Sequence, residues 1–91
     1  MDSQDMIAVT AEVDRVSKGA RVVEQTATDG SSGLLLVERP GNRHPWVVWR
    51  WATRYGGGNP VGGATGAMLW SGGYWATRAE AEQDMRDRPR G

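Results

Sequence analysis

One stretch of the sequence combines aromatic rings with arginine and is the part of the chain best suited to bind another molecule. Residues 45–51 have the sequence Pro-Trp-Val-Val-Trp-Arg-Trp and hold three of the five Trp in 91 residues. Arginine stacks on rings and binds phosphate or carboxylate through two parallel hydrogen bonds. The candidate binding residues lie in this stretch and around it: Arg43, Trp46, Arg50, Arg54, Tyr55 and Trp75.

Two kinds of partner fit these side chains. Trp, Tyr and Arg contribute most of the energy at protein interfaces, and that role needs no net positive charge. Single-stranded nucleic acid instead binds a positively charged groove with aromatic rings for its bases. A structural alternative is that Arg side chains cover Trp rings as cation–π contacts within the fold. We favour a partner protein or self-association, with single-stranded nucleic acid as the alternative.

Charge is unevenly distributed, although it cancels over the whole chain. Residues 1–38 have a net charge of −4, residues 39–78 have +5 with no acid, and residues 79–91 have −1. The central segment is therefore both basic and aromatic. Nucleic-acid-binding modules are usually strongly basic overall, so a neutral chain favours the protein partner.

Residues for catalysis or metal binding are few. The single His, His44, lies in an expected turn, and there is no Cys. A metal site needs clustered ligands, whereas the C-terminal carboxylates follow one helix that we expect to be solvated: Glu80, Glu82, Asp84 and Asp87. We predict that the protein is not an enzyme and uses no metal or small-molecule cofactor.

A glycine-rich segment has the spacing of a phosphate-binding P-loop. Residues 58–65 match that spacing, but Ala64 stands where the essential Lys would be. A P-loop precedes a helix whose N-terminus faces the phosphate, and here we expect a strand. We interpret the match as coincidental, and expect residues 55–66, with six Gly, to form a mobile loop.

Length and composition indicate one domain over residues 1–91. No apolar run approaches the ~18 residues that span a membrane, and the first residues are acidic where a signal peptide would be basic. We expect a cytoplasmic protein without membrane contact. Because the chain has 13 Gly and no Phe, its Trp side chains must form much of the core.

The tryptophan stretch is expected to be a strand over residues 46–54 in the middle of a sheet. Side chains alternate between the faces of a strand, which places Val47, Trp49 and Trp51 together on an uncharged core face. The other face is apolar and cationic, with Trp46 and Arg50. A strand that is apolar on both faces is usually central.

Residues 6–16 fit two structures. The β-branched residues among them favour a strand, followed by a turn at Lys18-Gly19 and a returning strand over residues 20–28. The alternative is a helix closed by Gly19. We favour the strand.

Further strands are expected over residues 34–37 and 67–70, with a turn at Gly72-Gly73 before a C-terminal helix. The helix has a capping box of Thr77 and Glu80, and is expected from about residue 78 to 88, before Pro89. Its apolar stripe is narrow, because Ala81 and Met85 are its main apolar residues. These elements predict an α+β fold: an antiparallel meander of four or five strands with one C-terminal helix packed on one face.

The second half of the chain resembles the strand–turn–helix ending of small uncharacterised proteins of phages, plasmids and other mobile genetic elements. The resemblance covers about residues 45–88. It rests on the tryptophan stretch, on Gly72-Gly73-Tyr74-Trp75-Ala76-Thr77, and on the helix with Glu80, Asp84 and Arg88. Those proteins often have Gly-His where this chain has Gly-Gly. The resemblance implies an accessory protein, such as an inhibitor or adaptor acting on a host macromolecule, and implies no catalytic residue.

Overall fold

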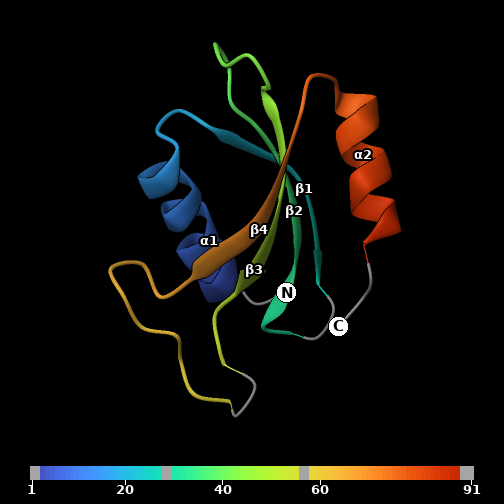
Figure 1. Cartoon of the computed structure of the whole chain (residues 1–91). Helices are drawn as coiled ribbons and strands as arrows, with labels where there is room; N and C mark the ends of the chain where they lie inside the picture. Colours follow the sequence, from blue (N-terminus) through green and yellow to red (C-terminus); the bar gives the residue numbers. More distant parts are fainter. Residues whose placement is uncertain (1–2, 28–29, 56–57, 89–91) are drawn as a thin grey trace.

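Four strands form one antiparallel sheet in which strand order follows chain order. The computed structural model describes residues 3–27, 30–55 and 58–88, and the expected meander and C-terminal helix are confirmed. The elements in this part of the chain are α1 (Ser3–Val16), β1 (Arg21–Ala27), β2 (Ser32–Glu38), β3 (Trp46–Ala52), β4 (Met68–Trp75) and α2 (Arg78–Asp87). The two helices lie on opposite faces of the sheet (Figure 1).

The strand that we favoured over residues 6–16 is wrong, because this segment belongs to helix α1. Val9 and Val13 are fully buried against β2 and β3. Each such burial contributes about 1.5–3 kcal/mol, whereas β-branched residues lose less than about 0.7 kcal/mol each in a helix. Burial therefore outweighs intrinsic propensity. Gly19 closes the connection with a φ of 84°, as the alternative required.

Strand β3 is covered on both faces, which confirms its central position. Val47, Trp49 and Trp51 lie on the α1 side in the larger core cluster, as predicted. Trp51 is fully buried, and its Nε1 donates to the Thr26 carbonyl oxygen at 3.1 Å. Because Val48 is buried on the other face, the sheet is enclosed between two helices and not covered on one face alone.

Helix α2 packs on the second face through the narrow stripe predicted from the sequence. Ala81 is fully buried against Leu36 and Val48, and Met85 is packed beside them. The capping box is present, since the Glu80 amide donates to Thr77 Oγ1 and the Thr77 amide donates to Glu80 Oε1. The helix begins at Arg78 and ends at Asp87, within the predicted bounds.

The turn predicted at Gly72-Gly73 is wrong, because strand β4 continues through both glycines. One residue separates Val48 from Arg50 on β3, but two separate their partners Gly73 and Trp70 on β4. The extra residue forms a β-bulge at Ser71, whose φ is 60°. The chain turns toward α2 only after Trp75.

Gly73 is needed because α2 approaches β4 closely at this position. A Cβ at Gly73 would lie 2.9 Å from Arg88 Nη2 and closer still to Asp84 Oδ2. Those atoms are held in place: Trp75 Nε1 donates to Asp84 Oδ2 at 2.9 Å, and Arg88 Nε donates to Asp84 Oδ1 at 3.1 Å. We call Gly73, Trp75, Asp84 and Arg88 the helix lock.

The glycine-rich loop has defined contacts at both ends. The Tyr55 amide donates to the Asn59 carbonyl, and the Val61 amide to the Thr53 carbonyl. At the other end, Thr65 Oγ1 donates to Glu12 of α1 at 2.8 Å. Residues 56 and 57 lie outside the described part, and the mobility of the loop stays a prediction. Strand β4, and no helix, follows the loop, so the P-loop match lacks its structural context.

The close approach at Gly73 predicts that Gly73→Ala is destabilising. The added methyl group must displace the Asp84 carboxylate from Trp75 and Arg88, and overpacking of this kind costs about 1–3 kcal/mol in the free energy of unfolding. Urea denaturation followed by Trp fluorescence measures the change. Gly30→Ala is the matched control, because a Cβ at Gly30 meets no atom within 4 Å; equal stability of the two variants would contradict the helix lock.

Candidate binding surface

The six residues selected from the sequence do not form one surface. Trp46 pairs with Trp75 at one end of the β3–β4 ladder, whereas Arg54 and Tyr55 lie beyond the other end of β3. A strand rises about 3.3 Å per residue, so the two groups are separated by roughly 20 Å along β3.

Trp46 and Trp75 pack beneath α2. Both rings are half-buried against Leu36, Val48 and Ala81. The Arg78 guanidinium carbon lies 5.5 Å from the centre of the Trp46 ring. These contacts agree with the structural alternative that arginine covers tryptophan within the fold.

The other four predicted residues differ in their surroundings. Arg50 is half-buried on the α2 side of β3, where its charge acts on Asp84. Arg54 Nη1 donates to the Gly58 carbonyl at 2.9 Å. Tyr55 is 56% exposed, and Arg43 is exposed in the β2–β3 hairpin.

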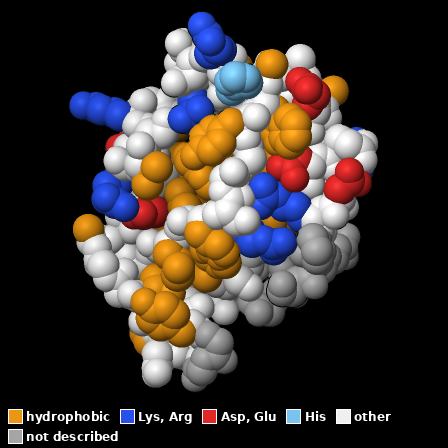
Figure 2. Space-filling model, in the orientation of Figure 1, with side chains coloured by type: hydrophobic (Ala, Val, Ile, Leu, Met, Phe, Trp, Pro, Cys, Tyr) orange, Lys and Arg blue, Asp and Glu red, His pale blue; other side chains and the backbone are white. Residues whose placement is uncertain are grey.

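Strand β4 is an edge strand and carries two exposed rings. Trp70 is 40% exposed and Tyr74 is 49% exposed. The Arg39 guanidinium carbon lies 4.9 Å from the centre of the Tyr74 ring, and Arg50 is the cross-strand neighbour of Trp70. We call these four residues the β4 surface. Figure 2 views the molecule with α1 and α2 on either side of β4, and hydrophobic side chains gather along β4 with Lys and Arg side chains beside them.

The bulge places the two rings on opposite faces of the sheet. Tyr74 pairs with Val47, whose side chain points to α1, whereas Trp70 pairs with Arg50 on the α2 side. Directly paired side chains share a face. Without the extra residue, positions 70 and 74 would lie on the same face. The rings therefore border the β4 edge from both sides.

The middle of the β4 edge is blocked against a further strand. Arg88 Nη1 donates to the Ser71 carbonyl oxygen at 2.6 Å, so this acceptor is occupied by a side chain. The bulge at Ser71 also bends the edge, and bulges of this kind protect edge strands from pairing. A partner at this edge would contact the side chains of β4 more than its backbone.

Sequence reasoning missed Arg39, Trp70 and Tyr74. We assigned Trp70 to a short strand and Tyr74 to a turn. A signal was present, because glycine inside an aromatic strand often marks a bulge or a close approach. Interpreting Gly72-Gly73 in this way would have joined both rings in one strand.

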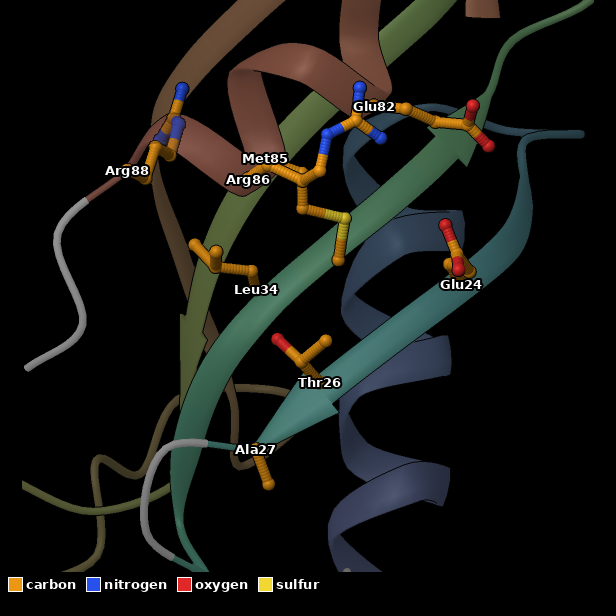
Figure 3. Close-up of a pocket in the computed structure, with 8 residues that line it drawn as sticks. All are labelled: Glu24, Thr26, Ala27, Leu34, Glu82, Met85, Arg86 and Arg88. Atoms are coloured by element: carbon orange, nitrogen blue, oxygen red, sulfur yellow. The ribbon is translucent and has the colours of Figure 1, made fainter. Parts of the chain in front are cut away.

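A groove of about 790 Å³ lies between α2 and the β1–β2 edge. Figure 3 shows Glu24 and Thr26 rising from β1 toward α2, whose Met85 points to Leu34. Acids and bases both line the groove: Glu24, Glu82, Arg86 and Arg88. Two of these already form ion pairs, Glu82 with Arg78 and Arg88 with Asp84. The mixed charges do not define a ligand class.

A smaller hollow of about 460 Å³ lies on the other side of α2 beside Trp75. Its charged lining is entirely acidic: Glu80, Asp84 and Asp87. These carboxylates have partners in α2 or at its two caps, namely Gln83, Thr77 and Arg88. The hollow places negative charge next to the end of β4.

Burial raises the pKa of Asp84, but this effect is outweighed. Hydrogen bonds from Arg88 and Trp75, with the charges of Arg88 and Arg50, lower the pKa below its ordinary value. The pKa of Glu12 is also lowered, chiefly by the hydrogen bond from Arg15, against the opposing effect of burial. Asp84 thus links α2 to β4 through Trp75, and Glu12 links α1 to the glycine-rich loop through Thr65.

Neither a metal site nor a comparison with known proteins assigns a function to the described part of the chain. Within the described residues, no three His, Cys, Asp or Glu side chains form a group that could hold a metal ion. His44 lines neither the groove nor the hollow. No helix among residues 3–27, 30–55 and 58–88 is long and apolar enough to cross a membrane. Comparison with protein-family models, curated proteins and solved structures found no match.

The lowered pKa of Asp84 predicts a loss of stability in acid. The unfolded chain has the ordinary pKa of 3.8 and takes up its proton first as the pH falls. The contribution of Asp84 to the free energy of unfolding is therefore complete above the pKa of the unfolded chain. It is lost as the pH falls through the lower pKa of the folded protein, within about pH 5 to 2. Urea unfolding at several pH values measures this dependence.

Asp84→Asn tests the assignment of this acid loss to one carboxylate. We expect a stability lower by about 1–3 kcal/mol at pH 7 and a flatter acid dependence than in the wild type. Asp87→Asn is the control on the same helix, because Asp87 is exposed and, among the described residues, accepts a hydrogen bond from Gln83 alone. An unchanged acid slope in Asp84→Asn would contradict the assignment.

Proposed function

We propose that the chain is a non-enzymatic binding protein, an adaptor or inhibitor that engages a partner protein through the β4 surface. The supporting observation is that Trp70 and Tyr74 remain 40% and 49% exposed on one edge strand. Aromatic residues with an adjacent arginine are typical anchors of protein interfaces. The partner is another protein or a second copy of the chain.

Burial elsewhere in the fold supports this choice of surface. Four of the five tryptophans pack in the two core clusters, namely Trp46, Trp49, Trp51 and Trp75. The fifth, Trp70, belongs to neither cluster. Ile7, on α1, is 70% exposed, but it has no exposed aromatic neighbour in its helix. Composition favours the β4 surface as the anchor, since Ile is not enriched at hot spots as Trp and Tyr are.

Single-stranded nucleic acid is the second candidate, favoured by the stacking of Arg39 on Tyr74 within a basic segment. Bases bind by stacking in succession on ring faces. Trp70 and Tyr74 lie on opposite faces of the sheet, and the predicted stacking rings Trp46 and Trp75 pack beneath α2. This arrangement favours a protein partner over a strand of bases.

A capture experiment tests the proposed function. The full chain is immobilised, and an extract of cells that express it is passed over the wild type and over a Trp70→Ser, Tyr74→Ser double variant. We expect the double variant to retain at least about tenfold less partner, because loss of a hot-spot ring costs 2 kcal/mol or more. Ile7→Ser is the control, since it also removes an exposed apolar side chain.

Two outcomes would overturn this proposal. One is full retention of the partner by the double variant, and the other is equal loss in the Ile7→Ser control. Sedimentation velocity of the chain alone detects self-association, which the double variant should abolish if the partner is a second copy. Urea denaturation of each variant verifies that the fold is intact, as expected for exposed positions.

A further inference from the structure

We infer that the partner of the β4 surface presents an acidic segment, whose carboxylates bind Arg39 and Arg43 while its apolar side chains cover Tyr74 and Trp70. This partner chemistry rests on the proposed protein-binding function of the same surface. It goes further by naming the charge of the partner and the two cations that recognise it.

The first observation is that these two cations lack carboxylate partners. Four arginines form ion pairs within the described residues: Arg15, Arg21, Arg78 and Arg88. Arg39 and Arg43 form none with any carboxylate in that part of the chain. No acid lies between residues 39 and 78, and Glu38, at the base of the β2–β3 hairpin, is already paired with Arg21.

The second observation concerns the donors of Arg39. Its Nη2 donates to the His44 carbonyl at 3.2 Å, while its Nε has no partner within the described structure. The guanidinium lies over the Tyr74 ring. Stacking uses the face of a guanidinium, and the Nε of Arg39 is buried. The in-plane N–H groups of Nη1 and Nη2 are therefore the donors that can match a carboxylate through two parallel hydrogen bonds.

The third observation is the position of this charge beside the rings. Register places the hairpin next to the end of β4, because Trp46 pairs with both Glu38 and Trp75. Tyr74, beneath Arg39, is thus flanked by cationic and apolar surface. The middle of the edge is blocked by the bulge and by Arg88, so the segment would bind through its side chains.

A protein segment fits better than a nucleic-acid backbone. The acid-lined hollow lies beside Trp75, directly after Tyr74, and would repel a polyanion that continues past β4. A short acidic segment can end before the hollow. Carboxylates next to Leu or Tyr side chains would satisfy both the cations and the rings.

Fluorescence anisotropy with defined probes tests this inference on the full chain. The first probe is a fluorescein-labelled synthetic peptide of repeated Glu-Glu-Leu-Glu-Tyr units. The second replaces every Glu by Gln, and the third is labelled oligothymidylate. We expect the acidic peptide to bind, with an affinity that falls as salt is added, and at least about tenfold more tightly than the other two.

Charge reversal locates the binding site of the acidic peptide. Arg39→Glu with Arg43→Glu should weaken its binding by about tenfold or more. Arg86→Glu is the matched control, because Arg86 is exposed on α2 and its hydrogen bond within the described part of the chain goes to Gln83. Arg39→Gln with Arg43→Gln replaces the reversed pair if that variant fails to fold, and should also weaken binding.

Four results would overturn the inference. These are no binding of the acidic peptide, equal binding of the Gln peptide, tighter binding of oligothymidylate, and equal loss in Arg86→Glu. Failure of this inference can be distinguished from failure of the proposed function. If captured partner still depends on Trp70 and Tyr74 while the acidic peptide does not bind, the surface binds protein but the charge assignment is wrong.

Discussion

A half-buried carboxylate, Asp84, holds the C-terminal helix on the sheet. It accepts hydrogen bonds from Trp75 and Arg88, and Gly73 leaves the space that brings it so close to β4. The apolar stripe of α2 is narrow, chiefly Ala81 and Met85, and it packs on Leu36, Val48 and the rings of Trp46 and Trp75. The hydrogen bonds of Asp84 add to this packing and hold the C-terminal end of α2 against β4.

The same lock shapes the open edge of the sheet. Arg88 donates both to Asp84 and to the Ser71 carbonyl, so helix attachment and edge protection share one side chain. Exposed aromatic residues on a flat edge would favour aggregation. With the edge bulged and blocked, the backbone between the exposed rings of Trp70 and Tyr74 is protected from pairing.

Charge and burial together define the β4 surface. Arg21 and Arg78 each form an exposed ion pair with a nearby carboxylate, and surface pairs of this kind have little effect on stability. The hairpin cations, Arg39 and Arg43, have no such carboxylate within the described residues. A neutral chain can thus present a local positive field beside its exposed rings, and such fields direct association more than they add affinity.

Local signals in the sequence determined the capping box of Thr77 and Glu80 and the two faces of the tryptophan strand, because both depend on residues close in the chain. The spacing of Val9 and Val13 fits a helix and a strand equally. The helix is favoured only because it buries both side chains against one face of the sheet. The bulge at Ser71 depends on register with β3, and the close approach at Gly73 depends on a helix that follows later in the chain. The candidate site was therefore decided by tertiary structure, since long-range burial covered Trp46 and Trp75 and left Trp70 and Tyr74 exposed.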